Sequence, residues 1–232
     1  MKVTIIHGQL HKGSTYHISE MIKDKIIDNK SVVDEYFMPR DTPQYCVGCY
    51  KCINMGEEFC PHAKEVQTIV KSLEDADVII VDSPTYCYEM TGQLKTLFDH
   101  LAYMWMPHRP REVMFAKVAI VISTAAGAGA NKVTKSLKQQ LFWMGVPVIY
   151  QLSQNVNASS WENVSPKIKI VIDKKIESIV KKTIRKICRV KPPIKLNAIF
   201  HIMGMMQKSN IWNMTDKNYW KRNGWLDGKH PW

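Results

Sequence analysis

The feature that most constrains this chain is the alternation of short apolar runs with longer amphipathic segments through most of its 232 residues. Five runs rich in β-branched residues predict strands at 3–6, 31–37, 78–81, 117–122 and 146–151. Apolar side chains at helical spacing predict helices at 15–29, around 66–73, at 91–104, up to about 144, and at 166–189. Strands that alternate with such helices are typical of an α/β fold with a doubly wound five-stranded parallel sheet.

The last forty or so residues do not continue this alternation. Pro192 and Pro193 end the last helix of the repeat, and the segment that follows contains four of the seven tryptophans. We therefore divide the chain into a sheet domain, residues 1–190, and a helical, Trp-rich C-terminal extension, residues 191–232. Because so much apolar surface seldom stays in water, we expect the extension to dock on the domain or on the partner in a homodimer.

The net charge of +11 is concentrated late in the chain. Residues 167–195 carry 11 basic and 2 acidic side chains, opposite an apolar stripe of isoleucines, which predicts a solvated helix face. No base-reading motif accompanies this charge, so we expect no nucleic-acid partner. No apolar run approaches the roughly 20 residues that span a bilayer, and six cysteines without a secretory signal indicate a cytoplasmic protein with reduced thiols and no transmembrane segment.

Three loops leave strands at the edge of the sheet where doubly wound proteins bind ligands. The first, residues 8–15, joins a strand to a helix, so its amides and the hydroxyls of Ser14 and Thr15 form an anion site. An ordinary glycine turn with a helix cap explains this loop equally well, whereas an ATP-binding loop would need lysine where Ser14 stands. The second loop, 83–92, mixes aromatic side chains with donors, which suits a flat ring with polar edges.

The third loop, residues 124–129, consists of residues small enough for the backbone to approach a ligand closely. It contains a Gly-x-Gly sequence, but Lys132 stands where a dinucleotide-binding fingerprint needs glycine or alanine, and the preceding strand is the fourth. The pattern therefore disfavours a Rossmann NAD site.

Taken together, residues 2 to about 188 resemble the NADPH-dependent FMN reductase family of flavodoxin-like proteins. Residues 8–15 are similar to its phosphate loop, 83–95 to its isoalloxazine loop and following helix, and 124–129 to its third flavin loop. In the phosphate loop this sequence departs from the family pattern, with Gln9, Leu10, His11 and Ser14 in place of Ser, Pro, Arg and Asn.

The resemblance implies an FMN-dependent NAD(P)H oxidoreductase that passes electrons to a quinone, a flavin or another small acceptor. Because the flavin carries the hydride chemistry, no catalytic side chain is required. The resemblance implies that these residues bind the cofactor: His11, Gly13, Ser14, Thr15, Pro84, Thr85, Tyr86, Cys87, Tyr88, Thr124, Ala125, Ala126, Gly127 and Gly129.

Four cysteines form a C-x2-C-x2-C-x7-C run at Cys46, Cys49, Cys52 and Cys60. This spacing resembles the compact [4Fe–4S] runs of ferredoxins and that of iron–sulfur flavoproteins, a branch of the same family, in which a cluster relays electrons to FMN. The alternative is that the thiols pack or stay free, as in flavin reductases without a cluster. Zinc is disfavoured because its structural sites usually use two separated pairs, and we assign no ligand role to Cys87 or Cys188.

Three functions follow, in decreasing order of support. The first is the FMN-dependent NAD(P)H oxidoreductase, working by ping-pong kinetics. The second is an iron–sulfur flavoprotein that serves as an electron carrier for a redox protein partner. The third is a non-enzymatic, metal-stabilised nucleic-acid-binding protein that uses the basic helix.

Overall fold

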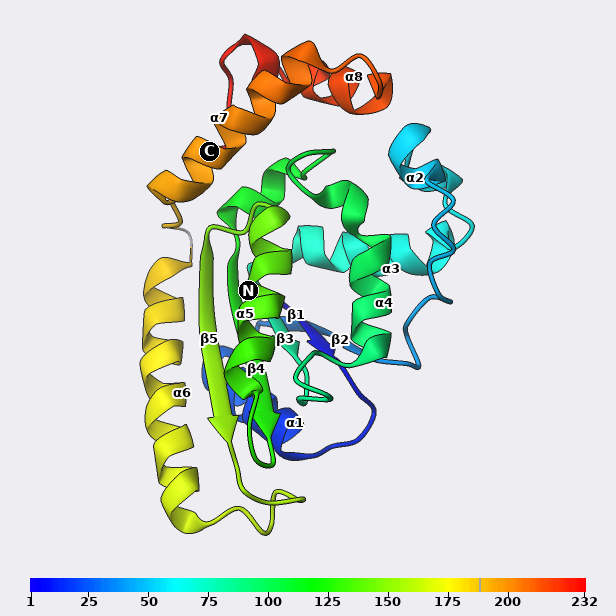
Figure 1. Ribbon diagram of the computed structural model, residues 1–232. Coiled ribbons are helices and arrows are strands. Elements are labelled where there is room, and N and C mark those ends of the chain that lie inside the picture. Colours follow the sequence, from blue (N-terminus) through cyan, green and yellow to red (C-terminus); the bar gives the residue numbers. More distant parts are fainter. Residues whose placement is uncertain (188) are drawn as a thin grey trace.

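The computed structural model describes residues 1–187 and 189–232, and these residues form one five-stranded parallel sheet in the order β2-β1-β3-β4-β5 (Figure 1). The strands are β1 (Lys2–His7), β2 (Val32–Phe37), β3 (Val78–Asp82), β4 (Val118–Ala125) and β5 (Val148–Asn155). The chain adds β2 on one side of β1 and then crosses back to add β3, β4 and β5 on the other. The predicted doubly wound, flavodoxin-like sheet is therefore confirmed.

The helices are α1 (Ser14–Ile26), α2 (Lys51–Asn54), α3 (Ala63–Asp75), α4 (Gly92–His100), α5 (Ala130–Trp143), α6 (Pro166–Lys186), α7 (Ile194–Ser209) and α8 (Met214–Arg222). Of the observed helices, α1, α3, α4, α5 and α6 are those that the sequence predicts for the sheet domain, whereas α2 and α8 are not predicted individually. Short 3₁₀ turns occupy Glu57–Phe59, Ala102–Met104, Glu112–Ala116 and Trp225–Asp227. Among the described residues, no helix has the length and apolarity that a membrane crossing requires.

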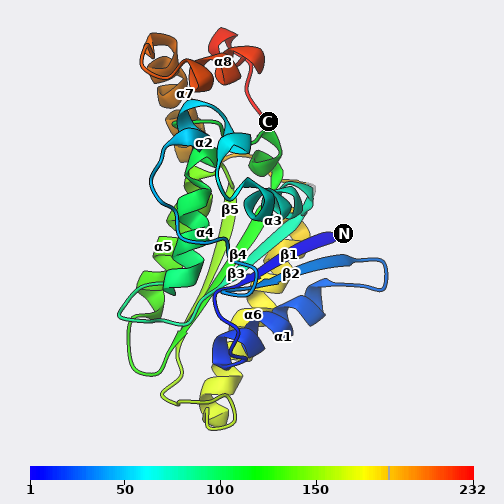
Figure 2. The ribbon, with the colours of Figure 1, turned by 90° about the vertical axis from the view of Figure 1, so that its right-hand side faces the viewer.

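The helices cover both faces of the sheet, as the two views show (Figures 1 and 2). One core lies between the sheet and α3, α4 and α5, and the other lies between the sheet and α1 and α6. The central strand β3 is buried along its whole length. A strand covered on both faces reads as a continuous apolar run, which is why the sequence identifies it so clearly.

The observed elements differ from the predicted ones mainly at their ends. Strands β4 and β5 continue to Ala125 and Asn155 through polar residues that apolar periodicity cannot recognise. The helix predicted at 91–104 ends at His100, and a separate 3₁₀ turn follows it. The last predicted helix is observed to Lys186, and Cys188 lies outside the described residues.

The C-terminal extension is helical, as predicted, and α7 and α8 lie across the amino-terminal ends of β4 and β5 (Figure 1). A third apolar cluster joins it to the domain, with Trp220 fully buried beside Phe200 and Phe115. The indole of Trp220 donates to the carbonyl of His108 at 2.6 Å, and the Tyr219 hydroxyl donates to the Pro110 carbonyl at 2.7 Å. Both hydrogen bonds join the extension to the segment between α4 and β4.

Candidate functional site

A pocket lies at the carboxyl ends of the strands, where four segments of the chain meet. It is lined by Gln9, His11, Gly13, Ser14, Thr15, Tyr16, Asp82, Pro84, Thr85, Tyr86, Thr124, Ala125, Ala126, Val156, Ala158 and Ser159. Three of the segments are the loops that the sequence singles out, and the fourth follows β5. The pocket lies at the edge where open α/β sheets bind their ligands.

The first loop is held tightly against the end of β3. The amide of Gly8 donates to the Asp82 carbonyl at 2.8 Å, and the Thr91 hydroxyl donates to the Gly8 carbonyl at 2.6 Å. A Cβ at Gly8 would lie 2.8 Å from the Asp82 oxygen, so only glycine allows this approach. The loop then reaches α1 through Gly13, with Ser14 and Thr15 buried in the first turn of the helix.

The beginning of α1 is suited to an anion. The first amides of a helix have no partner within the helix. Among the described residues, no side chain caps this end and no acidic side chain stands in its first turn. The first turn of α1 therefore offers amide donors and a positive helix end to the pocket.

A pair of hydroxyls joins the first loop to the third. The Oγ1 atoms of Thr15 and Thr124 lie 2.6 Å apart, although 109 residues separate them in the chain. Both side chains are about 5% exposed, so the hydrogen bond fixes α1 against the end of β4. The backbone amide of Thr85 donates to the carbonyl of Thr124 at 2.9 Å, which ties the second loop to the same point.

The second loop contains a tight turn whose central residues adopt left-handed backbone conformations. Tyr86 and Glu89 exchange backbone hydrogen bonds at 2.9 Å, and the φ angles of Cys87 and Tyr88 are +50° and +63°. Non-glycine residues rarely take this conformation in succession, and such strain concentrates at functional loops. The Tyr86 hydroxyl donates to the side-chain oxygen of Gln9, which connects the turn to the first loop.

The third loop places Gly129 directly against the second. Its φ angle is +102°, and an added Cβ would lie 2.9 Å from both Thr85 Cγ2 and Tyr88 Cδ1. We expect Gly129→Ala to lower the free energy of unfolding by about 1–3 kcal/mol, because both the backbone and the contact become unfavourable. Urea unfolding measures the change.

Gly127→Ala is the matched control, because an added methyl there would meet no atom of the described residues within 4 Å. An equal loss of stability in the two variants would contradict the assigned contact between the second and third loops.

The pocket brings together ten of the fourteen predicted cofactor residues. They are His11, Gly13, Ser14, Thr15, Pro84, Thr85, Tyr86, Thr124, Ala125 and Ala126. Cys87, Tyr88, Gly127 and Gly129 belong to the same loops but are not among the residues that line it. Sequence reasoning missed Gln9, Tyr16, Asp82 and the segment after β5, because apolar periodicity gives no sign of which polar residues follow a strand into a pocket.

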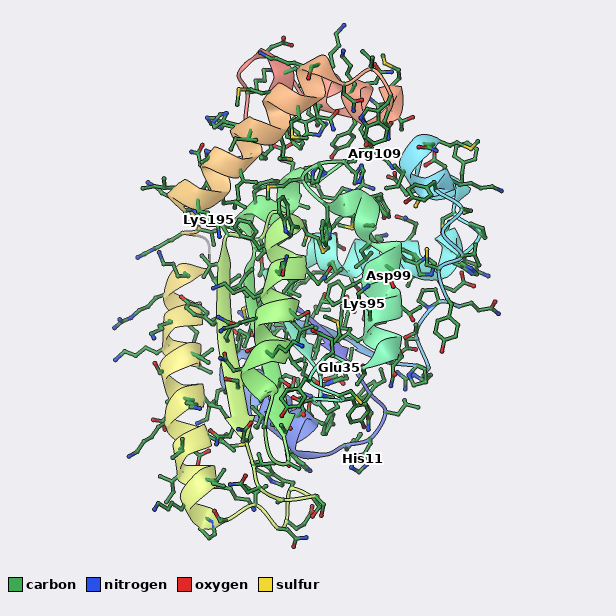
Figure 3. The ribbon with its side chains drawn as sticks, viewed as in Figure 1. His11, Glu35, Lys95, Asp99, Arg109 and Lys195 are labelled. Atoms are coloured by element: carbon green, nitrogen blue, oxygen red, sulfur yellow. The ribbon has the colours of Figure 1, made fainter. Side chains whose placement is uncertain are left out.

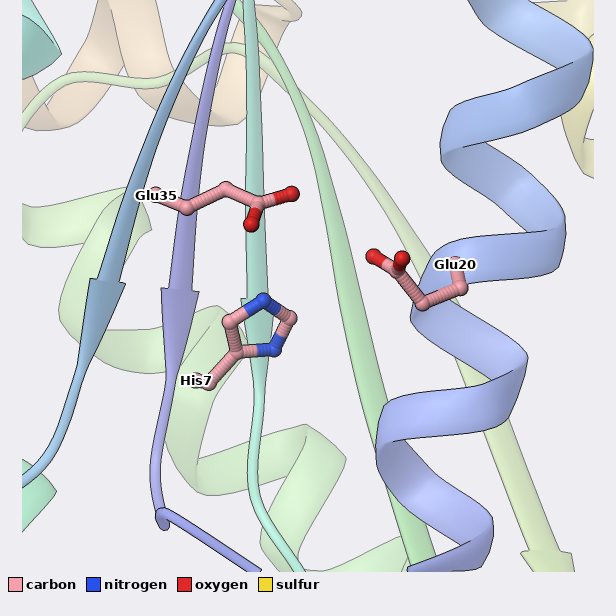
Figure 4. A group of neighbouring side chains, drawn as sticks. All are labelled: His7, Glu20 and Glu35. Carbon is pink, nitrogen blue, oxygen red and sulfur yellow. The ribbon is translucent and has the colours of Figure 1, made fainter. Parts of the chain in front are cut away.

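A buried pair lies beneath the pocket, at the ends of β1 and β3. The Nδ1 atom of His7 lies 2.6 Å from Oδ2 of Asp82, and both side chains are nearly inaccessible. The carboxylates of Glu20 and Glu35 lie beside the ring (Figure 4), and one oxygen of each lies within 4.8 Å of a ring nitrogen of His7. The Lys23 ammonium contacts these two carboxylates at 2.7 and 2.8 Å, so the chain itself supplies their cation.

The pKa of Lys23 agrees with that arrangement. Burial lowers it, but the hydrogen bonds to Glu20 and Glu35 outweigh burial and hold the pKa above its usual value. This cluster is therefore a structural ion pair below the pocket.

The four clustered cysteines lie on the segment between β2 and α3, residues 38–62, which we call the cysteine loop. Gly48 and Tyr50 have φ angles of +64° and +57°, which bend the chain between successive cysteines. Cys46 and Cys49 are exposed, whereas Cys52 and Cys60 are partly buried.

The thiols of the cysteine loop influence one another. Burial raises the pKa of the Cys52 thiol, and the neighbouring thiols Cys60, Cys46 and Cys49 raise it further, while Arg109 lowers it. His100, buried on α4, joins the two ends of the loop. Its Nδ1 lies 3.8 Å from the Cys60 sulfur, and its Nε2 lies 2.8 Å from the Gln44 carbonyl oxygen. Four thiols on one loop are a donor set that suits a soft cation or an iron–sulfur cluster.

Comparisons with known proteins agree with this geometry. The model of a family described as NADPH-dependent FMN reductase matches residues 1–159. An iron–sulfur flavoprotein of Clostridioides difficile (strain 630) is 28% identical over 210 residues, covering 88% of each chain. An iron–sulfur flavoprotein of Archaeoglobus fulgidus is 28% identical over 114 residues, covering 48% of this chain and 49% of the relative.

Solved structures share the fold. An FMN-dependent NADH-azoreductase from Bacillus anthracis, in complex with FMN, superposes with a TM-score of 0.57 at 12% identity, covering 80% of this chain and 99% of the other. An NADH:FMN oxidoreductase in its apo form superposes with a TM-score of 0.53 at 17% identity, covering 84% of this chain and 92% of the other. At these identities the likeness establishes the architecture.

Proposed function

Because this chain belongs to the NADPH-dependent FMN reductase family, it is an FMN-dependent oxidoreductase that uses NAD(P)H, and we propose that the four-segment pocket holds its FMN. The observation that supports this placement is the convergence of the three loops on the uncapped beginning of α1. The pocket combines an anion site with aromatic and small side chains, the two surfaces that a phosphorylated flavin needs.

The phosphate belongs at the first turn of α1. Its amide groups and the hydroxyls of Ser14 and Thr15 can donate to phosphate oxygens, and the helix dipole favours the negative charge. Lys12 adds a positive charge nearby, because its ammonium lies 4.9 Å from the centre of the Tyr16 ring. The donor set therefore fits a phosphate monoester.

The flavin ring belongs between the second and third loops. Pro84, Thr85 and Tyr86 line one part of the pocket, while Ala125 and Ala126 line another and leave space for a flat ring. When bound, FMN would supply hydride and electron transfer between a nicotinamide and an acceptor. The protein then needs only to orient the ring and exclude water, and we assign no side chain to acid–base catalysis.

The nicotinamide and the acceptor would use the same open side of the pocket in turn. We expect purified protein to take up one FMN per chain, and anaerobic NADPH or NADH to bleach the flavin absorbance. Steady-state kinetics with a quinone or free flavin as acceptor should be ping-pong, because the oxidised nicotinamide must leave before the acceptor enters. A stopped-flow spectrophotometer follows both half-reactions, and intersecting double-reciprocal lines would contradict this order.

A second function is supported by the cysteine loop. Four thiols on one loop suit a [4Fe–4S] cluster, and both sequence relatives described above bear the name iron–sulfur flavoprotein. We propose that Cys46, Cys49, Cys52 and Cys60 hold such a cluster. When bound, it would supply one-electron transfer, so the protein would also serve as an electron carrier for a redox protein.

We propose a homodimer in the cytoplasm as the working form. The extension exposes large apolar side chains that the sheet domain does not cover. They are Ile194, Ile202, Met205, Met206, Ile211, Trp212 and Met214. Surfaces of this kind are typical of subunit interfaces, and free thiols are typical of the cytoplasm. Light scattering coupled to size-exclusion chromatography measures the molecular mass directly.

A further inference from the structure

The cysteine loop is held from outside by residues distant in sequence. The carbonyls at the end of a helix lack partners within the helix, and at the end of α2 they belong to Cys52, Ile53 and Asn54. Arg109, which is 3% exposed, donates to the carbonyl of Ile53 at 3.0 Å and also to that of Cys52. Figure 3 shows Arg109 between α2 and the extension.

The extension supplies the other donors to the same carbonyls. Asn213 Nδ2 donates to the Ile53 carbonyl at 3.2 Å, and the Thr215 hydroxyl donates to the Asn54 carbonyl at 2.6 Å. These bonds connect residues about 160 positions apart, at the point where α8 lies beside α2 (Figure 1). The end of α2 is thus capped by a different part of the chain.

Asp216 organises these donors. Its carboxylate is fully buried, and it accepts hydrogen bonds from Arg109, from Asn213 Nδ2 at 2.9 Å and from His108 Nδ1 at 2.7 Å. A buried carboxylate without hydrogen-bond donors would destabilise the fold. The burial of Asp216 therefore depends on Arg109, Asn213 and His108 all being in place. The Asn213 side chain also accepts from the Asp216 amide at 3.0 Å, which starts α8 at this point.

The stretch between Cys52 and Cys60 is fixed in the same way. Glu57 pairs with Arg111, and its Oε2 lies 3.4 Å from Arg109 Nη2. The two arginines, from the segment between α4 and β4, therefore fix this stretch. The residues Asn213 and Thr215 of the extension fix the end of α2. Because Arg109 donates to the carbonyl of Cys52, its charge lies beside this cysteine.

We propose that the C-terminal extension is a working part of the cysteine site, in which Arg109, Asn213 and Asp216 are positioning residues. They hold the backbone that carries Cys52 in a conformation ready for metal ligation, and the balance of charge between Arg109 and Asp216 sets the electrostatic potential at that site. This proposal rests on the cluster proposed above. The extension has a geometric role, which is to position the backbone at Cys52, and an electrostatic role, which is to set the potential at the cysteine site.

The geometric role is tested in protein free of metal. Asp216→Asn removes the charge that binds Arg109, and we expect the Cys52 thiol to react with a disulfide reagent about tenfold faster or more, because the loop opens locally. Thr215→Val, which removes only one exposed hydrogen bond, should give a smaller increase. Mass spectrometry identifies the modified cysteine. Asp227→Asn, an exposed aspartate of the same extension, is the matched control and should leave the rate unchanged.

The electrostatic role is tested in iron-loaded protein by redox titration. A nearby positive charge favours the reduced, more negative cluster, so Arg109→Gln should shift its reduction potential to lower values. Asp216→Asn leaves the arginine less neutralised and should shift the potential to higher values. Shifts of opposite sign are not expected from simple loosening of the loop. FMN titration of each variant verifies that the sheet domain is intact.

The outcomes separate the two proposals. If the unmodified protein takes up no iron, the cluster proposal fails, and the thiol rates still decide the geometric role. If iron binds but Asp216→Asn changes neither the thiol rate nor the potential, the role of the extension is overturned.

Discussion

Combining Ser14→Ala with Thr15→Ala is expected to weaken FMN binding by about a hundredfold, which corresponds to about 3 kcal/mol, because two hydrogen bonds to a charged phosphate are lost. Riboflavin, which has no phosphate, should lose little affinity. Titrating both ligands by the quenching of flavin fluorescence gives the two dissociation constants. The comparison between ligands isolates the phosphate from the ring.

Two controls refine this result. Thr15→Ser keeps the hydroxyl that contacts Thr124, so it should bind FMN almost normally. Ser19→Ala alters a buried serine of the same helix whose hydroxyl lacks a hydrogen-bond partner among the described residues, and it should not affect either ligand. An equal loss for FMN and riboflavin in the double variant would overturn the assignment of the first loop to the phosphate.

Serine at Cys52 or Cys60 is expected to remove most of the iron from protein prepared anaerobically with iron and sulfide. The unmodified protein should contain about four irons per chain, as a [4Fe–4S] cluster requires, and absorb beyond the flavin bands. FMN should remain bound, because the segments that line its pocket do not include the cysteine loop. Iron analysis and the visible spectrum provide both measurements.

Cys87→Ser is the natural control for this experiment. Cys87 is exposed on the second loop, away from the C-x2-C-x2-C run, and its loss should leave the iron content unchanged. Anaerobic protein that contains FMN and no iron would show that the four thiols are structural or free, and the reductase function would stand without a relay.

The fold could be predicted because buried parallel strands form continuous apolar runs in the sequence. Val78–Asp82 is buried throughout, and four of its five residues are valine or isoleucine. The ends of β4 and β5 could not be predicted in the same way, because Ser153, Gln154 and Asn155 continue the ladder through backbone hydrogen bonds alone. The three pocket loops were recognisable because glycine, serine and proline follow strands at characteristic positions.

Other parts of the site have no local signal. The segment at Val156–Ser159 enters the pocket only because β5 directs it there. The pairing of Arg109 with Asp216 joins positions 107 apart, and nothing in the neighbourhood of either residue indicates its partner. Periodicity describes which face of an element is buried, whereas these contacts depend on how whole elements are placed.

The contacts between α2 and α8 also fix an order of events during synthesis. A chain folds from its N-terminal part while it is made, so the sheet and the four cysteines are complete before Asn213, Thr215 and Asp216 leave the ribosome. Until then the carbonyls of Cys52, Ile53 and Asn54 lack the donors that the extension provides. The nascent chain therefore presents its thiols on an unrestrained loop, and their final arrangement is reached only after the extension has been made.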